Sequence, residues 1–297
     1  MTLGLGEVCA LLAPLSWAVA VILFRRSDQA GLSPAAMNLF KNTLAIALLS
    51  LTLLAMGHGP PPGRSLGDWG ILAVSGLLGL AIADTLLFAG LRRIGAARLA
   101  LVDTVYAPMM VLLSWVFLAE RPSVGFLLGA VGVLGGVSLA SLDLRRAVAS
   151  GDRGVALGAL MAFGAITGTG ISVILVKPLL AEADLVEVIW VRLIAGVLGQ
   201  LVWVTARREW GEVARAFRPG PAWRTLVPAA FIGTYVSLLL WLGGFKWADA
   251  SVAAVLNQLA TIYTLTLAWA VLGEQVVPRQ VAGALLAVAG AVVIVLT

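Results

Sequence analysis

Cysteine and histidine are almost absent from this chain, which has one of each among its 297 residues. Cys9 alone cannot form an internal disulfide or a cysteine-based metal site. His58 lies in a stretch rich in glycine and proline, so a metal site or proton relay built from several histidines is also excluded. We therefore expect neither a metal centre nor a bound cofactor.

Charged residues are scarce as well. Asp, Glu, Lys and Arg make up 12% of the chain, whereas 61% of the residues are hydrophobic and the mean hydropathy is +1.02. Soluble proteins carry roughly 45–50% apolar and ~25% charged residues. A soluble domain of this size cannot hide so much apolar surface, because a large share of any folded surface faces solvent. The composition excludes a soluble enzyme, a nucleic-acid-binding domain and a disordered chain, and it predicts a protein embedded in a lipid bilayer.

The apolar residues fall into runs long enough to cross that bilayer. A helix needs about 20 apolar residues to span a hydrocarbon core of ~30 Å. The first run is expected to be a membrane helix rather than a cleaved signal sequence, because no Lys or Arg precedes it. The sequence predicts an all-α membrane protein with ten transmembrane helices, at 5–24, 34–56, 69–91, 97–118, 122–140, 154–176, 185–206, 224–245, 250–272 and 279–296.

The basic residues indicate how these helices are oriented. The loops that follow the odd-numbered helices hold 14 of the 20 Lys and Arg residues, the loops on the other side hold 4, and Lys41 and Arg192 lie within helices. Cytoplasmic loops carry an excess of Lys and Arg. We therefore expect the first set of loops in the cytoplasm and both chain termini on the outer, periplasmic side of a bacterial inner membrane.

The two halves of the chain resemble each other at a constant spacing. Each half holds five predicted helices, so the second copy must enter the membrane from the opposite side. We expect two inverted repeats, at residues 1–142 and 154–297, joined by a cytoplasmic linker at 143–153; such repeats are typical of secondary transporters. A shift of 154 residues aligns Gly79 with Gly233, Gly90 with Gly244, Trp115 with Trp269, Glu120 with Glu274, and Gly129 with Gly283.

Two segments then resemble a known family. The stretches 106–108 and 118–121, followed by Gly129, Gly132 and Gly136, are similar to the EamA-type repeat of the drug/metabolite transporter superfamily. The stretch 272–274 in the second half is similar to it too. The resemblance implies ten helices, inverted pseudo-symmetry and transport of small metabolites, often amino-acid efflux in bacteria. The chain departs from the family where Lys41 replaces an arginine and where Ile262 replaces the proline that the first half keeps as Pro108.

Ionisable residues inside the predicted spans are the main candidates for function, because a charge at the bilayer centre costs at least ~2.5–3.5 kcal/mol. At a rise of 1.5 Å per residue, Lys41 and Asp84 lie at similar depths, so the two side chains can form an ion pair. The pair is interpreted either as a structural link between helices or as a gating or coupling element, with no contact at all as a third alternative. Lys41 is also a candidate for contact with the substrate.

Arg192 differs, because the residue that matches Asp84 in the second half is Leu238. A guanidinium group that faces a cavity is suited to a carboxylate or phosphate, since its donors bind two oxygens at once. Three interpretations stay open: contact with an anionic group of a substrate, snorkelling or capping of backbone carbonyls, and a bond to an acidic residue of the first half.

Further polar and aromatic side chains complete the candidate site. Asp103 and Asn257 occupy matching positions near the starts of the fourth and ninth helices; both are interpreted as partners in bonds between helices or as lining of a cavity, and Asp103 is also a coupling candidate. Deep tyrosines need hydrogen-bond partners. The aromatic candidates for substrate contact, with ordinary packing as the alternative, are Trp17, Tyr106, Tyr235 and Tyr263.

Glycines recur four residues apart in two of the spans. Gly132 and Gly136 form such a pair in the fifth helix, and Gly283 forms one with Ala287 in the tenth. Small residues at this spacing allow two backbones to approach closely in lipid. The pattern predicts tight helix pairs, either within one chain or between the two copies of a homodimer.

Together these observations predict a secondary transporter that moves a small metabolite by alternating access. We expect it to export amino acids with aromatic or apolar side chains, and to act as a monomer or homodimer without nucleic acid as a partner. It is not expected to be an enzyme, and it lacks the GxxxxGK[ST] loop that binds ATP. The alternatives are an intramembrane enzyme that acts on a lipid phosphate and a membrane assembly subunit that transports nothing.

Overall fold

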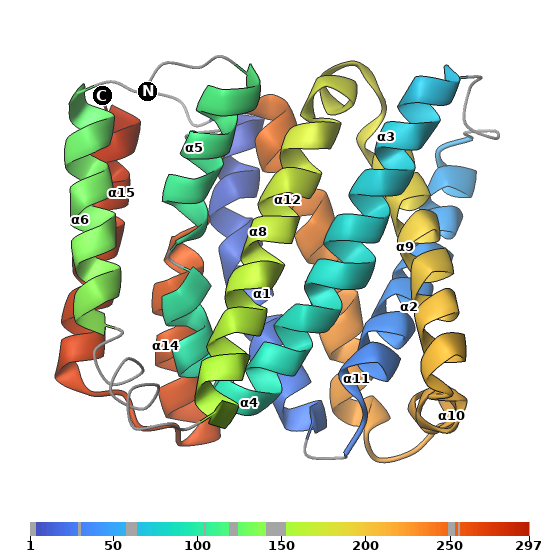
Figure 1. Ribbon diagram of the computed structural model, residues 1–297. Coiled ribbons are helices and arrows are strands. Elements are labelled where there is room, and N and C mark those ends of the chain that lie inside the picture. Colours follow the sequence, from blue (N-terminus) through green and yellow to red (C-terminus); the bar gives the residue numbers. More distant parts are fainter. Residues whose placement is uncertain are drawn as a thin grey trace.

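The computed structural model describes residues 4–28, 31–57, 64–103, 105–118, 124–140, 153–248, 253–254 and 256–296. Within these ranges the chain forms helices that run side by side, and no strand occurs among them (Figure 1). The stretch around His58, the Glu120–Arg121 pair and residues 143–152 of the expected linker lie outside the described residues.

The first half of the chain forms α1 (Leu5–Asp28), α2 (Pro34–Ala55), α3 (Leu66–Gly76), the π-helical segment η1 (Leu77–Ala83), α4 (Asp84–Asp103), α5 (Tyr106–Leu118) and α6 (Val124–Ala140). The second half begins with α8 (Arg153–Glu182) and α9 (Leu185–Arg207). The remaining elements are α10 (Trp210–Phe217), α11 (Trp223–Ala230), the π-helical segment η2 (Phe231–Val236), α12 (Ser237–Trp247), α14 (Leu259–Leu272) and α15 (Pro278–Leu296).

Several of these elements are long and apolar enough to cross a bilayer. Within the described residues six helices meet that criterion, and shorter apolar helices lie beside them, at Tyr106–Phe117 and Ile262–Leu272. Large apolar side chains on the outer faces are exposed, among them Leu54, Val131 and Val202 at 70% or more. A surface of this kind needs lipid around it. The chain is therefore a multi-pass membrane protein.

Sequence-encoded caps begin two of the long helices. Ser33 accepts a hydrogen bond from the Ala36 N–H, and Pro34 occupies the first turn of α2. Asp184 accepts from the N–H groups of Val186 and Glu187 at the start of α9. Ser and Asp at these positions satisfy amide groups that the helix itself leaves free, and proline in the first turn loses no bond. The predicted starts of these two spans are confirmed to within a residue.

Two predicted spans are interrupted. The span expected at 97–118 consists of the end of α4 and the whole of α5, and the two meet at a turn in which Val105 N–H bonds to the Val102 carbonyl. The span expected at 250–272 has a turn at Asn257 and Gln258 before α14 begins. Asp103 and Asn257 thus lie at interruptions rather than at helix starts. Hydropathy failed to predict these turns because it measures the character of side chains and not the course of the backbone.

The turn between the third and fourth predicted spans lies inside α4, at Gly95, whose φ of +78° belongs to the left-handed region. Glycine adopts that conformation without a steric cost. The next residue, Ala96, donates its N–H to Oε1 of Glu274 at 3.1 Å, and the same carboxylate oxygen lies 3.8 Å from Nε of Arg25. One carboxylate of the second half therefore links two segments of the first half.

The two π-helical segments occupy matching positions, because the 154-residue shift moves Leu77 onto Phe231. π-Helical turns are rare and occur frequently at functional sites. In η1 the Leu80 carbonyl accepts bonds from three buried side-chain amides: Asn38 and Gln200, each at 2.9 Å, and Asn42 at 3.2 Å. Amides from α2 and α9 therefore satisfy the backbone where η1 departs from α geometry.

The remaining packing is tight in one helix pair and aromatic in another. A Cβ added to Gly136 of α6 would lie 2.5 Å from the Gly283 carbonyl oxygen of α15, so the predicted close pair forms within one chain. The connection between the spans expected at 185–206 and 224–245 contains the short helix α10. Its eight residues are too few to cross a bilayer. Phe217 of α10 packs on Phe40 of α2, with ring centroids 5.1 Å apart.

Candidate functional site

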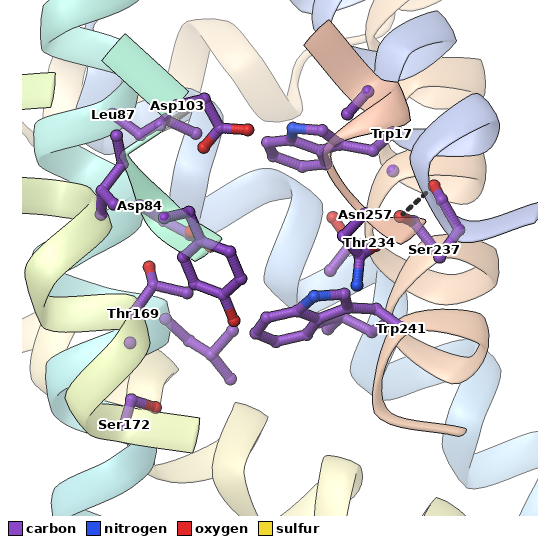
Figure 2. A pocket seen from close by; sticks show the side chains of 18 of the residues that line it. Trp17, Asp84, Leu87, Asp103, Thr169, Ser172, Thr234, Ser237, Trp241 and Asn257 are labelled. Carbon is purple, nitrogen blue, oxygen red and sulfur yellow. Dashed lines mark hydrogen bonds between the residues drawn. The ribbon is translucent and has the colours of Figure 1, made fainter. Parts of the chain in front are cut away.

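A cavity of about 130 Å³ lies between the helices. Its lining comes from both halves of the chain and includes the two π-helical segments through Gly79 and Gly233. Figure 2 shows side chains pointing into it from α1 and α4 of the first half and from α8, η2 and α12 of the second half. The structure brings together here most of the candidate residues, namely Trp17, Lys41, Asp84, Asp103, Tyr106, Arg192 and Asn257.

Two candidates are not part of this lining. Tyr235 shares a hydrogen bond of 2.8 Å with Thr52 through the two hydroxyl oxygens, and its ring stacks on Phe231 with centroids 5.6 Å apart. The phenol therefore has a partner in α2 and points to a helix contact rather than to the cavity. Tyr263 lies in α14 and is also absent from the lining.

The Lys41–Asp84 contact is confirmed. Lys41 Nζ lies 2.6 Å from Asp84 Oδ2 and donates a second bond of 2.8 Å to Asn42 Oδ1. The Lys41 side chain is 3% exposed and that of Asp84 17%. Ammonium and carboxylate therefore compensate each other, which removes most of the cost of holding either charge within the bundle.

Among the described residues, Arg192 of α9 has no ion-pair partner. The residue is 2% exposed, and its Nη2 donates to Ser172 Oγ at 2.8 Å. Nε and Nη1 are buried and have no hydrogen-bond partner in the described part of the chain. Leu238, which matches Asp84 in the second half, lines the same cavity with an apolar side chain. Buried polar atoms normally have partners, so these two donors can still bind an acceptor that is not among the described residues.

The surroundings of Arg192 fix the position of the guanidinium group. Ser75 and Ser172 each donate a hydroxyl hydrogen bond of 2.8 Å to the other's carbonyl, which joins α3 to α8. A Cβ on Gly79 would lie 2.4 Å from Ser172 Oγ, and one on Gly76 would lie 2.1 Å from the Arg192 carbonyl oxygen. Only glycine fits at these two positions. The repeat alignment marked Gly79, whereas nothing in the sequence marked Ser172.

Asp103 differs from Asp84 in having no hydrogen-bond or ion-pair partner among the described residues, although it lines the cavity. Figure 2 shows its carboxylate pointing into the cavity, toward the ring of Trp17 in this view. Asn257, at the matching interruption of the second half, donates from Nδ2 to the Ala253 carbonyl at 2.8 Å. Its amide therefore bonds within its own segment rather than to another helix.

The rings of Tyr106 and Trp241 also line the cavity. The centroids of Tyr106 and Trp241 are 6.4 Å apart, with the ring planes inclined at 43°. The Tyr106 hydroxyl is buried and lacks a partner among the described residues, as does the Thr234 hydroxyl. Trp241 was not among the sequence candidates, because only its neighbours in space set it apart from the other tryptophans within the spans. The described residues contain no cluster of three or more side chains that are typical metal ligands.

Comparison with known proteins adds a family and a fold. The model of the EamA-like transporter family matches the chain twice, at residues 4–142 and 156–296. No curated protein matches it. A solved structure described as "Crystal structure of protein" is similar with a TM-score of 0.71 and 19% identity, over 98% of this chain and 96% of that chain. At this identity the likeness concerns the fold.

Proposed function

The chain belongs to the EamA-like transporter family, and on that premise we propose that it exports amino acids with aromatic or apolar side chains across the bacterial inner membrane. Members of this family are transporters rather than enzymes. The observation that carries the proposal is the buried guanidinium of Arg192, which lines a cavity between membrane-spanning helices and has two donors without a partner among the described residues. The rings of Trp17, Tyr106 and Trp241 line the same cavity and provide apolar contact.

In this proposal Arg192 binds the carboxylate of the amino acid. Ser172 holds Nη2 of the guanidinium, so its remaining donors are oriented before the solute arrives. Such preorganisation lowers the ordering cost of binding. Trp17 and Trp241 contact the side chain of the solute, while Asn257 lines the same space. Lys41 acts through Asp84, and their ion pair fixes the position of α2 relative to α4.

The proposed transport is alternating access by two inverted repeats of five crossings each, at 1–142 and 154–297, with a cytoplasmic linker between them. Three features support this arrangement. The π-helical segments match at a shift of 154 residues, and so do the interruptions at Asp103 and Asn257. In Figure 1, α1 begins at the upper end of the bundle, whereas α8 begins at the lower end. Interrupted helices near the midplane are typical of secondary transporters.

The test is transport by purified protein in liposomes loaded with labelled phenylalanine or leucine. We expect saturable flux that Arg192→Gln reduces about tenfold or more, since a hydrogen bond to a charged group contributes about 1.5–3 kcal/mol. Arg192→Lys should restore part of the flux, because an ammonium group keeps the charge but not the paired donors.

Arg218→Gln is the matched control. Arg218 is an exposed arginine that follows α10, so its loss should leave flux unchanged. Absence of saturable flux for every amino acid tested would contradict the proposed substrate class. Equal flux from the two glutamine variants would remove Arg192 from the site.

A further inference from the structure

The described lining of the cavity contains four charged side chains, two of each sign. Lys41 and Asp84 are joined by an ion pair of 2.6 Å. Arg192 and Asp103 are not joined to each other, and neither has another ion-pair partner among the described residues. The described lining is therefore neutral in sum but presents one cation and one anion that have no ion-pair partner in the described part of the chain.

The pseudo-symmetry of the chain explains why these two charges are left over. The position that would supply a carboxylate to Arg192 holds Leu238, and the position that matches Asp103 holds the neutral Asn257. The second half therefore has no carboxylate at either of these two positions. A charge inside a membrane protein is costly and is retained where it serves a function, so the unmatched pair requires a bound partner.

The two unmatched charges lie in different parts of the cavity. In Figure 2 the carboxylate of Asp103 lies near Trp17 at one end of the space, and Ser172, which bonds to Arg192, lies at the other end. Trp241 lies between them in this view. A ligand that satisfies both must therefore carry separated positive and negative groups and an apolar portion.

We propose that Asp103 binds the ammonium group of the transported solute while Arg192 binds its carboxylate, so that the cavity selects zwitterions over solutes with either charge alone. This inference rests on the proposed export of amino acids. It assigns to Asp103 a role in substrate recognition, distinct from gating, and it gives the solute one orientation in the cavity.

The surroundings of Asp103 favour an organic ammonium group over a metal ion. Ca²⁺ takes six to eight oxygen ligands and Mg²⁺ takes six, whereas the structure offers one carboxylate here and an indole ring. A tryptophan face attracts an ammonium group through its quadrupole. The buried hydroxyl of Tyr106, which has no partner in the described chain, supplies a further hydrogen bond to the solute.

The test compares three ligands of similar size: L-phenylalanine, phenethylamine, which lacks the carboxylate, and 3-phenylpropionate, which lacks the amine. Two readouts are used, namely competition with labelled phenylalanine for flux and the rise in Tm that each ligand produces in detergent. For the unaltered protein we expect phenylalanine to bind about tenfold or more tightly than either analogue, because each charged hydrogen bond contributes about 1.5–3 kcal/mol.

The variants should then separate the two charges. Asp103→Asn should weaken phenylalanine and phenethylamine about tenfold and leave 3-phenylpropionate unchanged, whereas Arg192→Gln should weaken phenylalanine and 3-phenylpropionate and leave phenethylamine unchanged. Asn is accepted at the matching position 257, so Asp103→Asn should fold. Glu182→Gln, at an exposed carboxylate that ends α8, is the control and should bind all three ligands as the unaltered protein does.

Two results would overturn the inference. If Asp103→Asn weakened all three ligands equally, Asp103 would hold a coupling ion or a structural contact instead of the ammonium group. If the unaltered protein bound phenylalanine no better than its analogues, zwitterion selection would be wrong. Because the Tm readout needs no transport, a protein that binds phenylalanine through Asp103 but shows no flux would contradict the proposed function and leave this inference intact.

Discussion

At the scale of single residues, Lys41 and Arg192 are two buried cations with opposite solutions to the same problem. Lys41 has a carboxylate at 2.6 Å, while Arg192 has a neutral hydroxyl at 2.8 Å. The first arrangement is complete without a ligand, and the second is not. We therefore propose that Lys41 stabilises the fold and that Arg192 binds the solute, and the two proposals can be tested separately.

Asp84→Asn should destabilise the protein by about 3 kcal/mol or more, because it leaves the buried ammonium of Lys41 without a counter-charge. The double variant Lys41→Met with Asp84→Leu should recover much of that loss, since replacing a buried ion pair by apolar side chains is often neutral. Leucine already occupies the matching position 238. Thermal unfolding in detergent measures both, and a double variant less stable than Asp84→Asn would contradict this account.

Residues that carry charge were the part of the site that sequence could predict. Charges are rare within apolar runs, so Lys41, Asp84, Asp103 and Arg192 were evident, and all four line the cavity. Ser172 could not be found, because a serine within a helix has many structural uses. Its role depends on Ser75, Gly79 and Arg192 meeting at one point in space, which local sequence does not encode.

At the scale of secondary-structure elements, α6 and α15 pack closely because glycines lie where their backbones meet. Gly132 faces Gly290, with 2.9 Å between an added Cβ and the opposing Cα, and Gly136 faces the backbone of residues 283–287. The two helices stand together at one side of the bundle in Figure 1. Close backbone contact of this kind provides van der Waals packing that larger side chains would prevent.

Gly136→Val should therefore separate α6 from α15 and lower the free energy of unfolding by about 1–3 kcal/mol, as overpacking does elsewhere. Gly135→Val is a control at the adjacent residue. A Cβ at Gly135 meets nothing within 4 Å, so this variant should unfold at an unchanged temperature. Equal Tm values for the two valine variants would show that the glycine contact does not support the pair.

The course of individual helices was predicted well only where the backbone is regular. The starts of α2 and α9 follow from Ser33 and Asp184, whose capping bonds are local. The interruptions after Asp103 and at Asn257, and both π-helical segments, were not foreseen. Their backbone groups find partners in other elements, as Leu80 does in Asn38, Asn42 and Gln200, and such partners are invisible to a scan of hydropathy.

At the scale of the whole molecule, the distribution of Lys and Arg predicts that the loop at Arg92 and Arg93 faces the cytoplasm and that the chain termini face outward. In Figure 1 the start of α1, the start of α3 and the end of α15 lie at the same end of the bundle. Leu66, the first residue of α3, is 92% exposed. Position 66 should therefore be reachable from outside an intact cell, and position 93 should not.

A membrane-impermeant maleimide tests this orientation in a Cys9→Ala background. Leu66→Cys should react in intact cells, whereas Arg93→Cys should react only after the membrane is permeabilised. The opposite pattern would contradict the proposed orientation. Reaction of both positions in intact cells would show that the two ends do not lie on different sides of the membrane.

Each π-helical segment changes the direction in which the side chains after it point around the helix axis. An α-helix turns by about 100° per residue, since 3.6 residues complete a turn, and a π turn accommodates a longer hydrogen-bonded ring than an α turn does. The residues after η1 are thus rotated about the helix axis relative to their positions in a regular α-helix, and Asp84 is the first of them. If residues 77–83 formed a regular α-helix instead, the same sequence would carry Asp84 on another face of α4, turned away from Lys41.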